Sequence, residues 1–160
     1  MKLFFSILLG SIVFLSCTKS VEHSPVAKEI LLSNKIWQIK HIYSVQNNIV
    51  YFYERGGSNN TYNYDDDFLK FEKDGSGTYT AGNVDYSIDW QFDNNDKSEL
   101  SYTIHNYANG APADGIDHHM KLENLYISEN LLRYAEIYTN ENGTNTVSSV
   151  YREPAISGGH

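Results

Sequence analysis

The feature that most constrains this fold is a strict alternation of apolar and polar residues between positions 84 and 104. Every second side chain is large and apolar, which is the pattern of strands with one buried and one solvated face. A helix would spread the same aromatic rings around its circumference. The polar residues 93–98 interrupt the pattern, which predicts two antiparallel strands joined by a turn. The alternating apolar residues are Tyr86, Ile88, Trp90, Phe92, Leu100, Tyr102 and Ile104.

A second pair of strands is predicted immediately before the first. Residues 68–73 and 77–80 flank a turn in which Gly75 can adopt the positive φ that a tight hairpin needs. Residues 47–48 either form another hairpin turn or bend one long strand, so eight or nine strands are expected. The other predicted strands are residues 36–46, 49–55, 120–127, 131–138 and 146–152.

The connections of such a meander alternate between its two ends. We therefore expect the short turns to share one end and the long polar segments to rim an opening at the other. The short turns are residues 74–76, 93–98 and 128–130. The long segments are residues 56–66, 108–118 and 140–145.

The amino-terminal residues 1–16 have the pattern of a secretory signal, because Lys2 precedes an uncharged apolar run. This run is shorter than the roughly 20 apolar residues that cross a bilayer. Cys17 is the single cysteine of the chain, so it has no intramolecular disulfide partner. Residues 14–17 resemble the lipobox of bacterial lipoproteins, which implies that Cys17 carries fatty acyl chains such as palmitate after cleavage. A plain signal peptide with a spare thiol is the alternative.

The rest of the chain divides into a tether, one domain and a tail. Residues 17–24 are the predicted tether, 25–154 the domain and 155–160 a flexible tail. Ser24 can cap a short helix that begins at Pro25. Val26 and Ile30 lie one helical turn apart, and we expect this apolar face to dock on the sheet.

The composition argues against several classes of function. The net charge is −8 and the Lys and Arg residues are not clustered, which disfavours binding to nucleic acid. The sequence contains no phosphate-binding loop and no zinc-protease motif, so we predict neither enzyme activity nor a cofactor. His118 and His119 have suitable chemistry for a metal, but neighbours on a strand point to opposite faces, so no metal site is predicted.

The order of these motifs resembles the lipocalin-like lipoproteins of bacteria. A short helix leads into a first strand that bears Trp37, the hairpin 74–79 follows, and another strand surrounds Trp90. The apolar residues of 120–132 complete the likeness, which covers nearly the whole chain after the signal. The resemblance implies an all-β, up-and-down antiparallel barrel of about eight strands with a short amino-terminal helix. Thr18 after the cysteine resembles lipoproteins sorted to the outer membrane of diderm bacteria.

We predict that the barrel binds a small hydrophobic or lipidic molecule. His41 and Tyr43 alternate with Trp37, Ile39 and Val45 in a way that places all five on one face of a strand, directed into the barrel. His41 is either a core histidine with a hydrogen-bond partner or a polar group that orients the ligand. The predicted ligand-binding residues are Trp37, His41, Tyr43, Tyr86, Trp90 and Tyr102.

The alternative is a non-catalytic interaction module for a protein or a glycan. If aromatic rings fill the barrel, no room for a ligand remains, since about eight strands enclose space for side chains or one small molecule. The module would then use exposed tyrosines as contact residues. The candidates are Tyr51, Tyr53, Tyr62 and Tyr64. The oligomeric state is not predicted by either reading.

Overall fold

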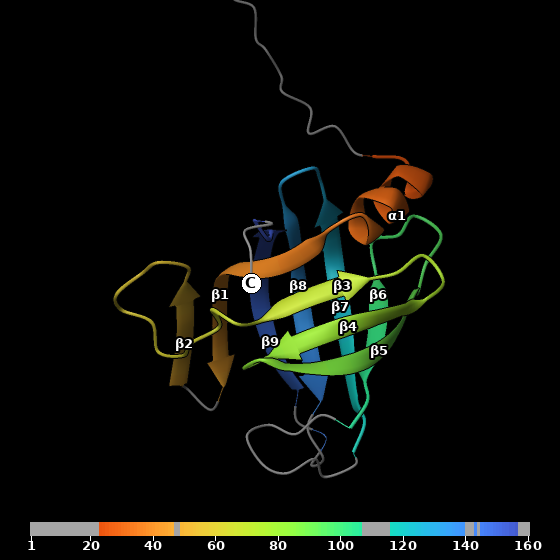
Figure 1. Ribbon diagram of the computed structural model, residues 1–160. Coiled ribbons are helices and arrows are strands. Elements are labelled where there is room, and N and C mark those ends of the chain that lie inside the picture. The colour runs from red at the N-terminus through yellow and green to blue at the C-terminus, as the bar shows by residue number, and fades with distance from the viewer. Residues whose placement is uncertain (1–22, 47–48, 107–115, 140–142, 144, 157–160) are drawn as a thin grey trace, which may run out of the picture.

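The computed structural model describes residues 23–46, 49–106, 116–139, 143 and 145–156. These residues form one helix and one nine-stranded antiparallel sheet (Figure 1). The elements are α1 (Pro25–Ser33), β1 (Ile36–Gln46), β2 (Ile49–Glu54), β3 (Phe68–Phe71), β4 (Ser76–Ala81), β5 (Val84–Phe92), β6 (Leu100–Ile104), β7 (His118–Ile127), β8 (Leu132–Thr139) and β9 (Asn145–Pro154).

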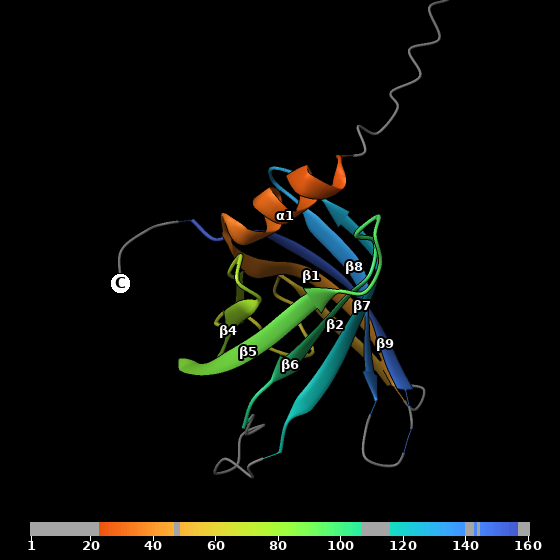
Figure 2. The same cartoon turned by 90° about the vertical axis from the view of Figure 1, so that its right-hand side faces the viewer.

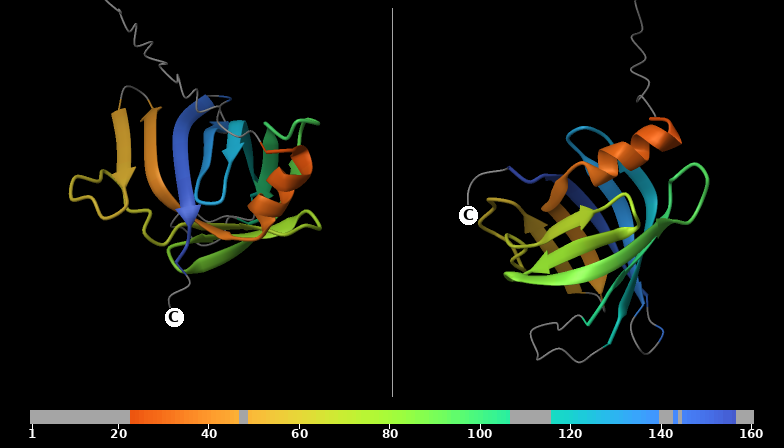
Figure 3. Two further views of the ribbon diagram at one scale, coloured as in Figure 1. Left: turned by 90° about the horizontal axis from the view of Figure 1, so that it is seen from above. Right: turned by 45° about the vertical axis from the view of Figure 1, so that its right-hand side comes forward.

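The sheet closes on itself, because β1 pairs antiparallel with β9. Strands β1 and β3 to β9 therefore make an eight-stranded up-and-down barrel, and β2 is an additional strand beside the ring (Figure 3). The predicted fold class is confirmed. Closure pairs the strand edges within the ring, so their backbone hydrogen bonds are made inside the molecule.

Strands β2 and β3 share one edge of β1 and divide it between them. Strand β2 pairs with residues 41–46, and β3 pairs with residues 36–38. Both run antiparallel to β1, so the segment 55–67 joins two strands of the same direction and lies beside the barrel wall (Figure 1). The prediction that 56–66 rims the opening is therefore wrong. Of the two alternatives for residues 47–48, the antiparallel β1–β2 pairing supports the hairpin over one long bent strand, although residues 47–48 themselves lie outside the described part of the chain.

The free edge of β2 is covered by side chains of the segment that follows it. Thr61 Oγ1 accepts from Phe52 N (2.7 Å) and donates to Phe52 O (3.0 Å). In the same way, Asn60 Oδ1 accepts from Glu54 N (2.8 Å) and Asn60 Nδ2 donates to Glu54 O (3.0 Å). These two side chains occupy the positions that a further strand would use.

Helix α1 covers the end of the barrel at which β1 begins (Figures 1 and 2). Ser24 Oγ accepts from Ala27 N (3.3 Å), as expected of a capping residue. Leu31 and Leu32 are buried in the core, and Trp37 Nε1 donates to Leu32 O (2.9 Å). Among the described residues, no helix has the length and hydropathy needed to cross a membrane.

The face of α1 that docks is not the predicted one. Val26 is 68% exposed and Ile30 is 43% exposed. Lys28 lies with Leu31 and Leu32 on the buried side, where its Nζ donates to Asp96 O (2.8 Å). The two adjacent leucines and this lysine hydrogen bond set the rotation of the helix, and the valine and isoleucine consequently face outward.

The two ends of the barrel differ as the alternation of connections requires. The β5–β6 turn contacts α1 through the ion pair of Lys97 with Glu29, and Glu129 of the β7–β8 turn pairs with Lys35 (2.8 Å), which lies between α1 and β1. The strand ends that flank residues 107–115 and 140–144 lie at the opposite end (Figures 1 and 2). The prediction that the short turns share one end is confirmed for these two turns.

Candidate functional site

Burial of the inward side chains changes along the axis of the barrel. On β8, Leu132 and Tyr134 are buried, whereas Glu136 and Tyr138 keep accessible surface. Strands β7 and β9 show the same gradient from the α1 end to the opposite end. The lumen is therefore packed solid near α1 and accessible near the other end. The fully buried side chains of the packed half include Trp37, Ile39, Leu69, Phe71, Leu100, Leu122, Ile127 and Leu132.

The prediction that His41 and Tyr43 point into the barrel is wrong. A β-bulge interrupts β1, because Ile39 pairs with Arg152 while His41 pairs with Tyr151, which leaves Lys40 as an extra residue. One extra residue transfers all later side chains to the other face of the strand. Tyr43 is consequently 46% exposed on the outer wall, and Val45 is exposed beside it.

The outer position of His41 has aromatic neighbours. Its ring makes edge contacts with Phe52 (5.3 Å) and Tyr151 (5.6 Å). The bulge itself is held by Arg55, whose backbone N donates to Lys40 O (2.9 Å) and whose Nε donates to Ile39 O (2.7 Å). His41 thus belongs to an outer cluster and not to the lumen.

Trp37 and Trp90 point inward as predicted, but both lie in the packed half. Trp37 has no exposed surface, and its indole N–H is used by α1. Trp90 Nε1 donates to Glu72 O (2.9 Å) and Ser76 O (2.8 Å), which fixes the β3–β4 turn. Both indoles therefore have structural roles in this conformation, and neither lines the accessible half.

A buried ion pair separates the two halves of the lumen. Arg152 Nη2, from β9, lies 2.8 Å from Asp67 Oδ1, at the entry to β3, and both side chains are buried. Arg152 Nε also donates a hydrogen bond to the hydroxyl oxygen of Tyr134 (2.7 Å). Tyr79 donates its hydroxyl to Asp67 Oδ2 (2.7 Å). Charges removed from water need such partners, so this network holds four strands in register.

Glu136 and Tyr102 form the polar base of the accessible half. The Tyr102 hydroxyl donates to Glu136 Oε2 (3.1 Å). Burial raises the pKa of Glu136 above its ordinary 4.5, and the positive charge of Arg152 opposes that rise. Glu136 nevertheless keeps accessible surface, which the lumen provides because its side chain lies inside the barrel. The pair can exchange hydrogen bonds with a polar group that enters from the open end.

Half-buried side chains of mixed character line the rest of the accessible half. The His118 and Tyr138 rings are stacked with their centroids 5.9 Å apart. Met120 pairs with both Tyr102 and Tyr138 in the strand register, so its flexible thioether lies on the inner face between them. Tyr86, a predicted ligand contact, is directed inward on β5. The lumen-facing residues of this half are Tyr86, Tyr102, His118, Met120, Glu136, Tyr138, Thr146 and Ser148.

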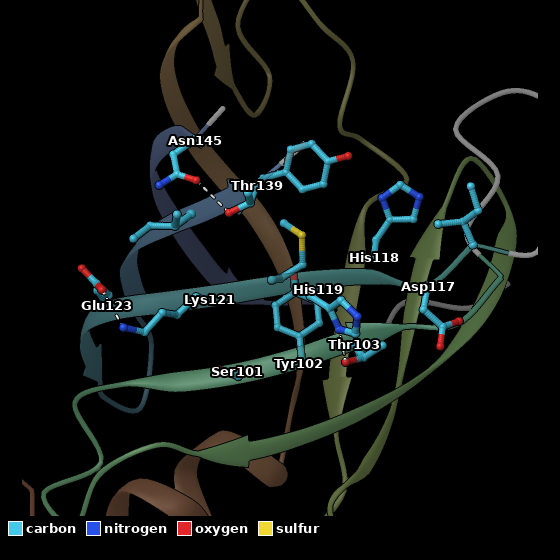
Figure 4. A pocket seen from close by; sticks show the side chains of 14 residues that line it. Ser101, Tyr102, Thr103, Asp117, His118, His119, Lys121, Glu123, Thr139 and Asn145 are labelled. Carbon is cyan, nitrogen blue, oxygen red and sulfur yellow. Dashed lines mark hydrogen bonds and ion pairs between the residues drawn. The ribbon is translucent and has the colours of Figure 1, made fainter. Parts of the chain in front are cut away.

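A groove of about 810 Å³ is lined by residues of β6, β7 and β8 and of the chain beside them (Figure 4). Its lining includes the lumen-facing Tyr102, His118, Met120 and Tyr138 together with outward residues of the same strands. Thr103 and His119 are hydrogen-bonded there (2.9 Å), and Lys121 pairs with Glu123 (2.8 Å). Because these polar groups are already paired with one another, the groove offers few free partners to a ligand.

His105 lies between two carboxylates near the open end. Its Nε2 is 3.0 Å from Asp89 Oδ2 and its Nδ1 is 3.1 Å from Asp117 Oδ2. His118 and His119 point apart, to the inner and outer faces of β7 (Figure 4). In the described segments, no three His, Cys, Asp or Glu side chains are arranged to hold a metal ion.

The four tyrosines proposed as surface contacts are not equally exposed. Tyr53 is fully buried, and its hydroxyl donates to Asp65 Oδ1 (2.6 Å). Tyr64 packs against the core and makes an edge contact with Tyr53 (5.5 Å). Tyr62 is exposed and stacks on Tyr64 (6.0 Å), while Tyr51 contacts Tyr62 (5.7 Å). A row of four rings therefore runs from the core to the surface, and the prediction that Tyr53 is displayed is wrong.

Comparisons with models of protein families, with curated proteins and with solved structures find no match to this chain. The likeness to lipocalin-like lipoproteins therefore stays a prediction from sequence order. The barrel is established by the strand pairing alone.

Sequence reasoning did not identify the charged residues of the lumen. Glu136 and Arg152 occupy inward positions, two residues from Tyr134 and Val150 respectively. A charged residue at an apolar position of a strand is a signal that could have singled them out. The contribution of Asp67 had no such signal, because it lies among three consecutive aspartates in a segment without alternation.

Proposed function

We propose that this protein is a lipid-anchored barrel of the bacterial cell envelope that binds a small molecule in the accessible half of its lumen. The observation that carries the proposal is the gradient of burial along β7, β8 and β9. Inward residues change from solvent-accessible to fully buried, and the change occurs at Glu136 and Tyr102. Ligand sites in small barrels are concave, mostly apolar and carry a few converging polar groups.

The lining supports an amphipathic ligand. Tyr86, Met120 and Tyr138 supply aromatic and apolar walls, and the Glu136–Tyr102 pair supplies hydrogen-bonding atoms at the base. A mainly apolar molecule with one polar end would satisfy both. The packed half near α1 leaves no space beyond the ion pair, so the bound part of the ligand is short. Tyr86 and Tyr102 are the two predicted contacts that we retain.

The amino-terminal sequence supports the anchor. The apolar run of residues 3–15 followed by Cys17 suits export and lipid attachment, and Thr18 suits the outer membrane. The resemblance to lipocalin-like lipoproteins also supports a location in the cell envelope. We propose binding without catalysis, because the sequence offers no nucleophile or metal motif.

Native mass spectrometry of protein purified from its own host tests the proposal. The wild type should retain a small molecule, and Met120→Trp should lose it because the larger side chain fills the accessible half. Lys121→Trp is the matched control, since the next residue of β7 faces the outer wall. Retention by both variants, or by neither, would contradict a site in the lumen.

An interaction surface is the second candidate, and one observation favours it. Val45 pairs with Val50 on one side and with Val147 on the other, and all three are exposed on the outer wall. An exposed apolar cluster across three strands is typical of a contact surface. Loss of partner capture by Val45→Ser, with the lumen variants unaffected, would select this candidate over ligand binding.

A further inference from the structure

The structure leaves an apolar surface around α1 that nothing in the described chain covers. Val26 and Ile30 lie on the outward side of the helix, and Ile36 (47% exposed) begins the strand that follows. Ile156 (87% exposed) is next to Ala155, whose N–H donates to Ile36 O (2.8 Å). We call Val26, Ile30, Ile36 and Ile156 the α1-end surface. Three separate parts of the chain therefore expose aliphatic side chains at the same end of the barrel.

We propose that the α1-end surface rests in the interfacial layer of the lipid bilayer to which the protein is anchored. The inference rests on the proposed lipid anchor at Cys17. It adds an orientation: the barrel stands on its α1 end, and the accessible half of the lumen faces away from the membrane.

The length of the tether supports this orientation. Pro25 lies eight positions after Cys17, and eight steps along the chain span at most about 28 Å when fully extended. The ten-residue strands β7 and β9 are each about 33 Å long. The start of α1 is therefore always near the membrane, and the open end can reach it only if the barrel lies on its side.

Two lysines near α1 are neutralised by carboxylates, and a third is hydrogen-bonded to a backbone carbonyl. Lys35 binds Glu129 (2.8 Å), Lys97 binds Glu29, and Lys28 donates to Asp96 O. Paired charges cost less to bring toward a medium of low dielectric constant than isolated ones. Short aliphatic side chains on one face of a helix then insert at the boundary between headgroups and acyl chains.

A lipid surface explains the position of these residues better than a protein partner does. An apolar helix face in contact with water is unfavourable, and the two leucines of α1, Leu31 and Leu32, are buried. The exposed face adjoins the tether, so the anchored molecule brings it to the bilayer without a further binding event.

Site-directed fluorescence quenching tests the proposal on the full-length protein. The lipidated protein is reconstituted into vesicles of phosphatidylethanolamine and phosphatidylglycerol that contain doxyl-labelled lipids. Acylation of Cys17 leaves an introduced cysteine as the single free thiol for an environment-sensitive fluorophore. The test position is Ile30→Cys, and the matched position is Val84→Cys, an exposed residue at the opposite end of the barrel. Both sites are exposed, so the substitutions do not disturb the core.

We expect the label at position 30 to be quenched several-fold more strongly than the label at position 84. Equal quenching, or protection of position 30 without quenching, would overturn the orientation and indicate water or a protein at that surface. The same samples report the anchor separately, because Cys17→Ser should release the protein from the vesicles. Retention of the Cys17→Ser protein would refute the anchor, and the orientation would fall with it.

Discussion

The guanidinium of Arg152 and the carboxylate of Asp67 meet inside the barrel at 2.8 Å, although 84 positions of the sequence separate them. Asp67 is the last residue of the segment 55–67 that connects β2 to β3, and Arg152 belongs to the last strand. This pair therefore links the segment 55–67 to the β1–β9 pairing that closes the barrel.

Removal of Asp67 should destabilise the fold strongly. Asp67→Ala leaves the buried Arg152 charge without its carboxylate, and breaking such a pair costs about 3–5 kcal/mol. Urea unfolding monitored by tryptophan fluorescence measures the loss. Lys40→Ala is the control, because its pair with Glu153 lies at the surface and contributes less than about 1 kcal/mol. Equal losses in the two variants would show that Arg152 does not depend on Asp67. Combining Asp67→Leu with Arg152→Met should recover part of the stability.

Glu136→Gln should stabilise the protein at neutral pH and leave it unchanged in acid. Burial raises the pKa of Glu136, so the folded state holds its proton at a pH where the unfolded chain has lost it. The native protein therefore loses stability as the pH rises above 4.5, the ordinary value, and the neutral glutamine removes that loss while still accepting from Tyr102. The difference in Tm between variant and wild type should grow with pH. A difference independent of pH would place the carboxylate in water.

His105 should contribute stability that declines above neutral pH. The hydrogen bond to Asp89, followed by that to Asp117, raises the pKa of His105 above 6.5. The stabilisation is fully present below that value and is lost as the pH rises through the higher folded-state pKa. His105→Gln should therefore lower Tm more at about pH 5.5 than at about pH 8.5, which bracket the ordinary range of histidine. Asp89→Asn should reduce the same pH dependence, and an unchanged slope in that variant would disprove the assignment.

Two aromatic substitutions in β1 test the bulge at Lys40. Trp37→Ala empties a fully buried site and should cost about 3–5 kcal/mol. Tyr43→Ala, six residues later at an exposed position, should change stability by no more than about 0.5 kcal/mol. Calorimetric unfolding distinguishes the two. Comparable losses would mean that Tyr43 faces the core, as an uninterrupted strand would require.

The barrel was predictable because most strands alternate without interruption. Residues 84–104 and the hairpin around Gly75 have the predicted pairing, and Gly75 has the expected positive φ of 89°. In contrast, the bulge at Lys40 leaves no trace in the alternation, because Trp37 and Ile39 before it and Tyr43 and Val45 after it all occupy odd positions. Its cause is the distant side chain of Arg55.

The buried face of the helix and the contacts inside the lumen also depend on residues that are distant in the sequence. Val26 and Ile30 satisfy a helical spacing as well as Leu31 does, and only the contacts of Lys28 and Trp37 decide which face is buried. The Asp67–Arg152 pair forms between strands that are remote in sequence, so no local pattern encodes it. Sequence periodicity predicted the wall of the barrel, whereas the interior depends on contacts between distant residues.

The amide of Asn60 and the hydroxyl of Thr61 have a consequence beyond their local bonds. They take the donors and acceptors of Phe52 and Glu54 that a strand from a neighbouring molecule would require. Where identical barrels meet at high concentration, this arrangement blocks growth of the sheet from one molecule into the next. The protein can therefore reach a high local concentration without polymerising through β2.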